Sequence, residues 1–173
     1  LSTMASALYL AGGPTDMGTI REIKLYRRNK LISSFDVYEF ITDGKFSTNV
    51  RLEDNDVIIV SPYTNVVTVS GAVKRPMRYE MKSNENLSKL IKYSGGFADS
   101  ANVSFVHIDR IKSTGEKYNG GAVAQSFDVP AAKFAEFHME DGDVVTINKN
   151  VNRFKNRVVV TGAVWYPGTY SIS

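Results

Sequence analysis

The sequence predicts an α+β fold built from tandem copies of one unit, and three observations lead to this prediction. The segments VTVSGAVKRPMRYEM (67–81) and VVVTGAVWYPGTYSI (158–172) share seven residues at one offset, 162 − 71 = 91, where unrelated stretches share about one. Strand-like alternation and one short helical pattern follow the first of these segments. The chain has 173 residues, 43% hydrophobic and 23% charged, as is usual for globular domains.

The similarity extends over most of the chain with small insertions. LYLAGG (8–13) matches IKYSGG (91–96) at 95 − 12 = 83, and SFDV (34–37) recurs at 126–129, at 126 − 34 = 92. The second copy has therefore gained nine residues, most easily in the polar loop STGEKYNGG. These offsets predict a partial unit at 1–61 that lacks its opening hairpin, a complete unit at 66–148, and the opening hairpin of a following unit at 157–173. The chain resembles a window cut from a longer tandem array.

The complete unit is expected to open with a β-hairpin. Val67 and Val69 alternate with polar residues, which is typical of a half-buried strand. Pro76 fixes φ for a turn, and Tyr79 and Met81 alternate on the returning strand.

A short helix is expected next. Leu87, Leu90 and Ile91 share one helical face, with Ser83 and Asn84 available as caps. The pair Gly95-Gly96 ends this helix, because a residue with positive φ after a helix is least strained as glycine.

Three further strands complete the unit, at 105–110, 124–129 and 144–147, with a weak helical turn near 131–137. The order of hairpin, helix and three strands suits a β-grasp (ubiquitin-like) fold, in which a mixed sheet of four or five strands packs on one helix. A unit of roughly 80 residues buries a modest core, so the units are expected to lean on one another.

These blocks resemble the SLBB (soluble ligand-binding β-grasp) domain, in particular its tandem copies in outer-membrane capsular and exopolysaccharide export proteins of Gram-negative bacteria. The similarity lies in V-x-V-x-G-x-V-x-x-P-G-x-Y, a helix ending in Gly-Gly, a strand ending in Arg, and D-G-D-x-V. The residues that carry it are Gly71, Pro76, Tyr79, Gly95, Gly96, Arg110 and Asp143, then Gly162, Pro167, Gly168 and Tyr170. Met77 stands where the family has glycine, which puts a type II turn in doubt. Asn55 also replaces a glycine, but asparagine tolerates the left-handed conformation.

The resemblance implies a periplasmic, ring-forming translocon for capsule or exopolysaccharide. Its implied partners are a polysaccharide, further copies of the chain and other parts of the export machine. The membrane anchor and the targeting signal are expected to lie outside this piece, which starts at Leu1 without a signal sequence.

Composition excludes several classes of function. The absence of cysteine excludes disulfides, thiolate zinc sites and a cysteine nucleophile. Nucleophile elbows, phosphate loops and HExxH helices are absent from the sequence, so we expect a protein that is not an enzyme and needs no cofactor. The aliphatic runs are far shorter than the ~20 residues of a membrane-spanning helix.

Two possible metal sites are interpreted as structural features. The acidic blocks 53–56 and 140–143 resemble calcium loops, but position twelve counted from Asp141 is Asn152 rather than a bidentate glutamate. We therefore expect turns that feed strands. His107 and His138 align with Lys24 and Arg51 in the repeat, so both are expected at exposed positions without a metal role.

The net charge of +3 and two basic clusters allow an anionic partner. The clusters are expected to be solvated faces; they comprise Arg21, Lys24, Arg27, Arg28 and Lys30, and Lys149, Arg153, Lys155 and Arg157. Few aromatic residues interleave with them, so an anionic polysaccharide is a simpler partner than nucleic acid.

The hairpin turns offer candidate contact residues. Trp165 and Tyr166 stand where the other copy has Lys74 and Arg75. Exposed aromatic rings stack on sugars and also bury well at subunit contacts, and we favour the subunit contact.

The leading hypothesis is a non-catalytic module of an oligomeric polysaccharide-export channel. The alternatives are a receptor module for a small soluble ligand and, third, a glycan hydrolase or lyase. We also predict that the spare hairpin 157–173 fills the missing place in residues 1–61, either within one chain or between two. In the isolated segment, the helix face around Met4, Ala7 and Leu8 is expected to be open.

Overall fold

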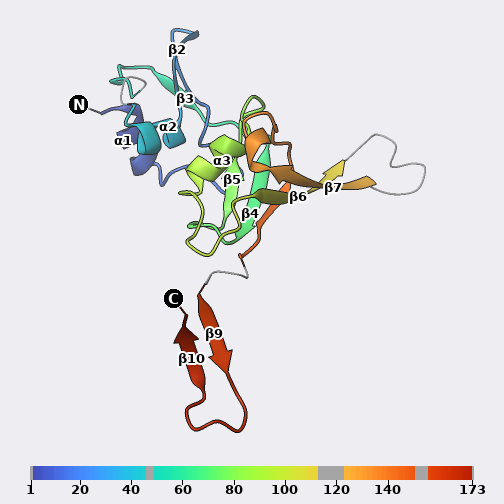
Figure 1. The fold of residues 1–173 in the computed structure, drawn as a ribbon. Coiled ribbons are helices and arrows are strands. Elements are labelled where there is room, and N and C mark those ends of the chain that lie inside the picture. The colour runs from blue at the N-terminus through green and yellow to red at the C-terminus, as the bar shows by residue number, and fades with distance from the viewer. Residues whose placement is uncertain (1, 46–48, 113–122, 151–155, 173) are drawn as a thin grey trace.

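The computed structural model describes residues 2–45, 49–112, 123–150 and 156–172. It confirms an α+β chain, whose helices and strands form three separate sheets (Figure 1). In chain order the elements are α1 (Met4–Leu10), β1 (Ile23–Arg27), β2 (Lys30–Phe35), α2 (Val37–Asp43), β3 (Val57–Ile59), β4 (Val66–Gly71), β5 (Arg78–Glu80), α3 (Leu87–Tyr93), β6 (Phe105–Lys112), β7 (Val123–Pro130), the 3₁₀ helix η2 (Ala131–Lys133), β8 (Val144–Ile147), β9 (Arg157–Val160) and β10 (Gly168–Ser171).

The central sheet has five strands in the order β5-β4-β8-β6-β7. It is mixed, because β4 pairs with β8 in parallel while every other neighbouring pair is antiparallel. Parallel neighbours need a long connection, and here the whole span from β5 to β7 supplies it. The predicted strands of this unit are all present, with β6 and β7 extending one or two residues further than expected.

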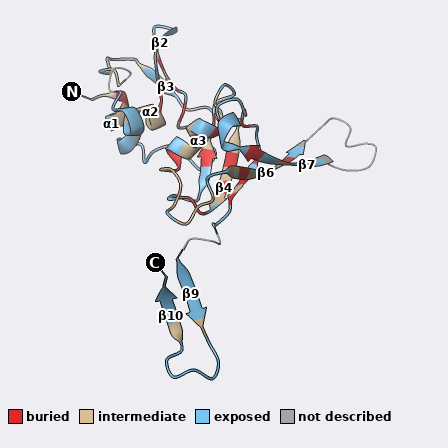
Figure 2. Ribbon diagram, viewed as in Figure 1, coloured by how far each residue is buried: buried red, intermediate tan, exposed pale blue. Residues whose placement is uncertain are grey.

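Helix α3 packs its apolar face on the central sheet. Leu87, Leu90 and Tyr93 are buried in one cluster with Val67 and Val69 of β4 (Figure 2). The cap is Asn86, whose side chain accepts from the Lys89 N–H. The expected caps Asn84 and Ser83 are therefore wrong, by two and three residues. The helix ends as predicted, with Gly95 and Gly96 at positive φ.

The N-terminal segment has a smaller core of its own. Met4 of α1 is buried together with Ile23 and Leu25 of β1 and Phe35 of β2, in the sheet β2-β1-β3. The expectation that Met4 lies open is therefore wrong, since the strands reach over this end of α1, while Ala7 and Leu8 stay half-buried. Helix α2, capped by the Asp36 side chain, was not anticipated; in the central unit the same place holds only η2.

Equivalent residues of the two segments make equivalent backbone contacts. The Met4 N–H donates to Val50 at 3.1 Å, and the Leu87 N–H donates to Phe137 at 2.9 Å. The Gly13 N–H donates to Leu8 at 2.8 Å, and the Gly96 N–H to Ile91 at 2.9 Å. Strands β1, β2 and β3 thus occupy the places of β6, β7 and β8, and the three-stranded sheet has no counterpart of β4 and β5. The division of the chain into units stays a prediction.

Residues 157–171 form an antiparallel hairpin, β9-β10, which lies apart from the other two sheets in Figure 1. Among the described residues its strands pair only with one another. Filling of the N-terminal segment by the hairpin of the same chain is therefore not what this structure shows. Exchange between two chains stays a prediction.

Candidate functional site

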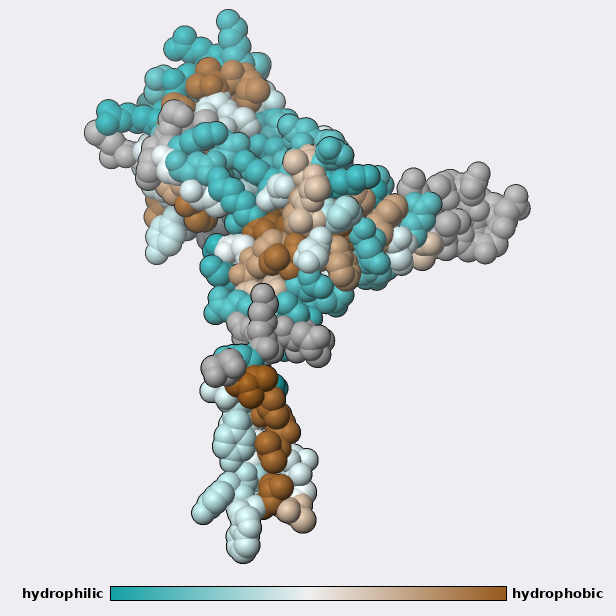
Figure 3. Space-filling model, in the orientation of Figure 1, coloured by the Kyte–Doolittle hydropathy of each residue, from teal (hydrophilic) through white to brown (hydrophobic). Residues whose placement is uncertain are grey.

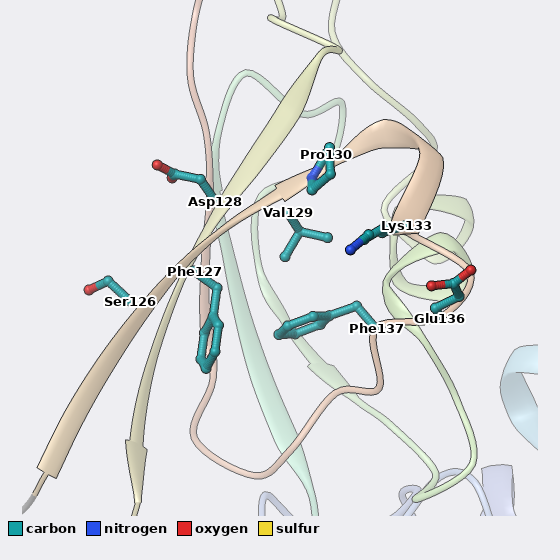
Figure 4. Close-up of a pocket in the computed structure, with 8 residues that line it drawn as sticks. All are labelled: Ser126, Phe127, Asp128, Val129, Pro130, Lys133, Glu136 and Phe137. Atoms are coloured by element: carbon teal, nitrogen blue, oxygen red, sulfur yellow. The ribbon is translucent and has the colours of Figure 1, made fainter.

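A shallow groove of about 540 Å³ lies along the outer edge of the central sheet (Figure 4). It forms where β7 ends at Pro130 and the chain turns through η2, so that one continuous stretch of chain supplies both walls. The residues that line it are Ser126, Phe127, Asp128, Val129, Pro130, Lys133, Glu136 and Phe137.

Two aromatic rings form the floor of the groove. Phe127 and Phe137 meet edge to face, with 5.4 Å between ring centroids. The Arg110 guanidinium stacks on both rings, 5.6 Å from the centroid of Phe127 and 5.1 Å from that of Phe137. This arrangement fixes the rings while leaving them half-exposed, which is how a protein presents an apolar face to a ligand.

The rim of the groove is polar. Asp128, Lys133 and Glu136 are exposed around the two rings, so both signs of charge border the apolar floor. Five of the eight lining residues are exposed, and the hollow is therefore open along its length. Small-molecule sites ordinarily bury 70–90% of their ligand. An open groove of this kind instead fits a segment of a longer polymer.

His107 on β6 stands next to this rim. Its Nδ1 lies 2.7 Å from Asp128 Oδ1 across the strand pair, and its Nε2 lies 3.3 Å from Asp109 on its own strand. The hydrogen bond to Asp128 and the nearby Asp109 charge raise the pKa of His107. The side chain is half-buried rather than freely exposed as predicted, because two carboxylates flank it.

We expect the His107 pKa, followed by NMR titration of its ring protons, to lie above 6.5 and to fall in Asp128→Asn. A raised folded-state pKa means that this contact stabilises the fold fully below about pH 6.5 and less as pH rises through the folded value. Glu136→Gln is the matched control, since Glu136 borders the same groove without contacting His107. An unchanged pKa in Asp128→Asn would contradict the assigned cause.

The motif arginine and aspartate form a buried pair beneath the groove. Arg110 Nε and Nη2 donate to the two Asp143 oxygens at 2.7 and 2.8 Å, Nη1 bonds Glu140, and Nη2 reaches the His138 carbonyl. The N-terminal segment repeats this set with Arg27, which binds Asp56 at 2.8 and 2.9 Å, Glu53 and the Arg51 carbonyl. Hydrogen bonds from Arg27 and from the Glu53 N–H lower the pKa of Asp56 to about 2.

These pairs explain the two acidic blocks. Each aspartate accepts from the backbone N–H three residues earlier, which closes a turn that leads into β3 or β8. Asn55 (φ 65°) and Gly142 (φ 82°) occupy the left-handed position of that turn, as predicted for the asparagine. In the described part of the chain, no group of three or more histidine or acidic side chains is placed to hold a metal ion.

A second ionic cluster joins the two segments. Arg21 is 2% exposed, although the sequence placed it on a solvated face. It donates to Asp36 at 3.0 Å, to both Glu85 oxygens at 2.8 and 2.9 Å, and to the Glu80 carbonyl at 2.8 Å. Burial opposes the charged form, but the bonds to Glu85 and Asp36 outweigh it and raise the pKa of Arg21. This cluster holds the segments together, and a hollow of about 660 Å³ that Arg21, Glu80 and Lys82 help to line opens beside it.

The contact residues predicted at the hairpin turns are not brought together. Lys74 and Arg75 lie exposed between β4 and β5, and Trp165 and Tyr166 lie in the equivalent turn between β9 and β10. Trp165 is 95% exposed. The Arg75 backbone N–H bonds the Ser94 carbonyl and its guanidinium covers Gly95, which ties the first turn to the end of α3.

Other motif residues shape the two hairpins. Tyr79 and Tyr170 each donate their hydroxyl to the carbonyl four residues earlier, at 2.7 Å. Gly71 and Gly162 both have positive φ, while Gly168 and Met77, the residues after Pro167 and Pro76, do not. The type II turn expected from glycine at this place is therefore absent from both hairpins.

The groove residues Phe137 and Lys133 were not singled out by sequence. The repeated SFDV block was the available signal, because it aligns Phe127 with Phe35 in the repeat. The Phe35 ring packs on Phe40 in the N-terminal core. Only the fold shows that Phe127 is half-exposed whereas Phe35 is buried.

Part of the chain matches a known family of domains. Residues 66–125 match the family model of the SLBB domain, in agreement with the resemblance drawn from the motifs. The SLBB domain is a ligand-binding module found in polysaccharide export proteins. No curated protein matches the chain. In the described ranges, none of the helices has the combined length and apolar character that crossing a membrane requires.

Proposed function

Because residues 66–125 form an SLBB domain, we propose that the chain is a non-catalytic module of a polysaccharide-export translocon. In this role it works on the periplasmic side of the outer membrane of a Gram-negative bacterium, in a homo-oligomer with other components of the export machine. The transported polymer is a capsular or exopolysaccharide. The family match is the single observation that carries the proposal.

The internal symmetry of the chain supports a structural role. We propose that the two segments are tandem β-grasp units, since α1 and α3, the arginine pairs and the strand orders correspond. Repeated modules that lean on one another make extended assemblies, in which each unit contributes surface rather than a reaction centre.

The groove along β7 is the proposed glycan contact. Its Phe127 and Phe137 edges offer an apolar surface for the C–H face of a sugar ring, and its open shape lets a chain enter and leave. Lys133 supplies a positive charge for an acidic sugar. Trp165 and Tyr166 are a second exposed aromatic surface, which we assign to contact between subunits.

The alternative function is a receptor for a small soluble ligand. Such a ligand needs a concave site that removes most of its surface from water. The groove is open on the side of Ser126, Lys133 and Glu136, so the geometry favours the polymer.

We expect the 173-residue chain to bind acidic oligosaccharides weakly, and Lys133→Glu to weaken that binding by about fivefold, the effect of losing roughly 1 kcal/mol. Chemical shifts of Phe127, Val129 and Phe137 followed during NMR titration measure both the site and the affinity. Lys133 is exposed and makes no side-chain ion pair among the described residues, so the fold is unaffected.

Lys74→Glu is the matched control, because Lys74 is exposed in the central unit away from the groove. Equal losses in both variants would show a non-specific charge effect and remove the groove from the proposal. Tight binding of a vitamin-like ligand without oligosaccharide binding would favour the receptor alternative. Breakdown of the oligosaccharide by the pure chain would contradict a non-catalytic role.

The export role is tested in the producing cell. Deletion of the segment that encodes residues 66–148 is expected to abolish surface polysaccharide, while synthesis of the polymer inside the cell continues. Normal surface polysaccharide in that strain would contradict the proposal.

A further inference from the structure

A second hollow, of about 390 Å³, lies at one end of the sheet β2-β1-β3 and shares no residue with the groove along β7. Its walls come from β1, from the turn between β1 and β2, and from β3 with the turn that precedes it. In Figure 3 hydrophobic side chains gather over this sheet, below the hydrophilic tip where β1 turns into β2. The residues that line the hollow are Tyr26, Arg28, Asn29, Asn55, Val57 and Ile59.

The floor of this hollow is apolar. Alternation along β1 places Leu25 in the core and Tyr26 on the opposite, outer face of the sheet. Tyr26 pairs with Val57 across the strands, and Ile59 follows on the same face of β3. Val57 is 55% and Ile59 is 43% exposed. A tyrosine ring beside two aliphatic side chains offers a surface on which the C–H face of a sugar ring can pack.

The rim of the hollow carries three polar side chains that are free to bind a ligand. Arg28, Asn29 and Asn55 are exposed, and their side chains make no hydrogen bond or ion pair with the residues that the structure describes. The nearby carboxylates of Glu53 and Asp56 do not compensate Arg28, because Arg27 binds both of them. Arg28 is therefore an uncompensated positive charge, and a guanidinium binds a carboxylate through two parallel hydrogen bonds.

The backbone of the rim has a conformation that side chains rarely adopt. Arg28 (φ 49°), Asn29 (φ 60°) and Asn55 (φ 65°) are the three residues other than glycine with positive φ in the described part of the chain. A two-residue hairpin turn with positive φ at both positions favours asparagine, aspartate or glycine at the first of them. Arginine is strained there, and strained residues gather at functional sites. Its presence indicates a role for the side chain rather than for the turn.

The central unit shows which of these residues the fold does not need. Both units share the buried arginine and aspartate pair, Arg27 with Asp56 and Arg110 with Asp143. The lining of the hollow is not shared, although the strands correspond. The equivalents of Tyr26, Asn55 and Ile59 are Asp109, Gly142 and Thr146. The aromatic ring and the amide are thus additions of the N-terminal segment to a turn and a sheet that fold without them.

We propose that this hollow binds an acidic sugar residue of the uronic acid class. The Tyr26 ring packs on the C–H face of the sugar, Arg28 binds its carboxylate, and the amides of Asn29 and Asn55 hydrogen-bond its hydroxyl groups. The inference rests on the proposed function in that the ligand is a glycan. It adds to the groove a separate contact site on the N-terminal segment.

Titration with trigalacturonic acid, followed by NMR, tests the site. We expect the ring signals of Tyr26 and the side-chain amide signals of Asn29 and Asn55 to shift. The methyl ester of the same trisaccharide has no negative charge and is expected to bind about tenfold more weakly, since it loses the charge-assisted bonds to Arg28. Absence of these shifts with trigalacturonic acid and with triglucuronic acid would overturn the site.

Arg28→Gly separates a binding role from a structural one. The substitution removes the guanidinium and relaxes the backbone at φ 49°. We expect the affinity for trigalacturonic acid to fall about tenfold, while the urea midpoint of unfolding stays the same or rises. An unchanged affinity with a lowered midpoint would show that Arg28 serves the turn alone and would overturn the proposal.

Lys30→Ala is the matched control for charge. Lys30 is exposed in the same hairpin but does not line the hollow, so its removal is expected to change the affinity by less than about twofold. Equal losses in Lys30→Ala and Arg28→Gly would overturn specific recognition. Asn55→Gly introduces the residue of the central unit and is expected to weaken binding about threefold, with the fold retained.

The same titration distinguishes this site from the groove. Phe127 and Phe137 report on the groove, and Lys133→Glu is expected to leave the Tyr26 shifts unchanged, because Lys133 is absent from this lining. Shifts of Tyr26 without shifts of Phe127 and Phe137 would support the hollow and remove the groove as a glycan contact. Shifts of the two phenylalanines alone would overturn the hollow and leave the groove in place.

Discussion

Replacing Arg21 by alanine is expected to lower the free energy of unfolding by about 3–5 kcal/mol, the usual cost of removing one partner of a buried ion pair. The guanidinium bridges two segments of the chain, with Asp36 on its own side and Glu85 on the other. The Tyr38 ring stacks on it at 4.4 Å and the Tyr93 ring at 4.9 Å, so water has little access.

The cost arises from the carboxylates that remain. Burial raises the pKa of both acids, but hydrogen bonds from Arg21, Lys82 and Tyr93 outweigh it and hold the pKa of Asp36 and of Glu85 below their ordinary values. Without Arg21, two largely buried negative charges face one another with only Lys82, 2.6 Å from Asp36, to compensate. Urea unfolding, followed by far-UV circular dichroism, measures the loss of stability.

Two variants control this prediction. Lys30→Ala removes an exposed charge of the same basic cluster and is expected to change stability by less than about 0.5 kcal/mol. Adding Glu85→Gln to Arg21→Ala is expected to recover part of the loss, since it removes one uncompensated charge. A loss below about 1 kcal/mol in Arg21→Ala would contradict the role assigned to the cluster.

Local patterns predicted much of the central unit. Alternation at Val67 and Val69, the Leu87 and Leu90 spacing, and the Gly95-Gly96 stop depend on residues close in sequence, and the structure has a strand, a helix and a helix end at these places. Short-range periodicity and backbone φ preferences are properties that one stretch of sequence carries by itself.

The features that sequence did not predict depend on distant residues. The residues next to Arg21 in the sequence do not distinguish it from a solvated arginine. The fold brings it into contact with Glu85 and Tyr93, which are 64 and 72 residues away in the sequence. The groove also depends on distant parts of the chain. Phe127 is half-exposed whereas its repeat equivalent Phe35 is buried, and the two segments differ here because the central unit has η2 where the N-terminal segment has α2. Repeat alignment compares residue types and does not compare their surroundings.

Gly71→Ala is expected to destabilise the central unit by about 2–5 kcal/mol, through backbone strain and overpacking together. Gly71 has φ 85°, and an added Cβ would lie 2.2 Å from the Ile147 carbonyl oxygen. That oxygen cannot retreat without losing the 2.7 Å bond from the Ala72 N–H, on which the parallel pairing of β4 and β8 depends. Urea unfolding measures the change.

Gly162→Ala is the matched control within the same chain, since Gly162 occupies the equivalent bend with φ 100° and an added Cβ meets nothing within 4 Å. It is expected to cost only the local strain of about 1–2 kcal/mol in the hairpin and to leave unfolding of the central unit unchanged. Equal effects of the two variants on that transition would show that close approach to Ile147 is not the cause. Glycine is thus needed at this bend wherever a neighbouring strand lies against it, as β8 does at Gly71.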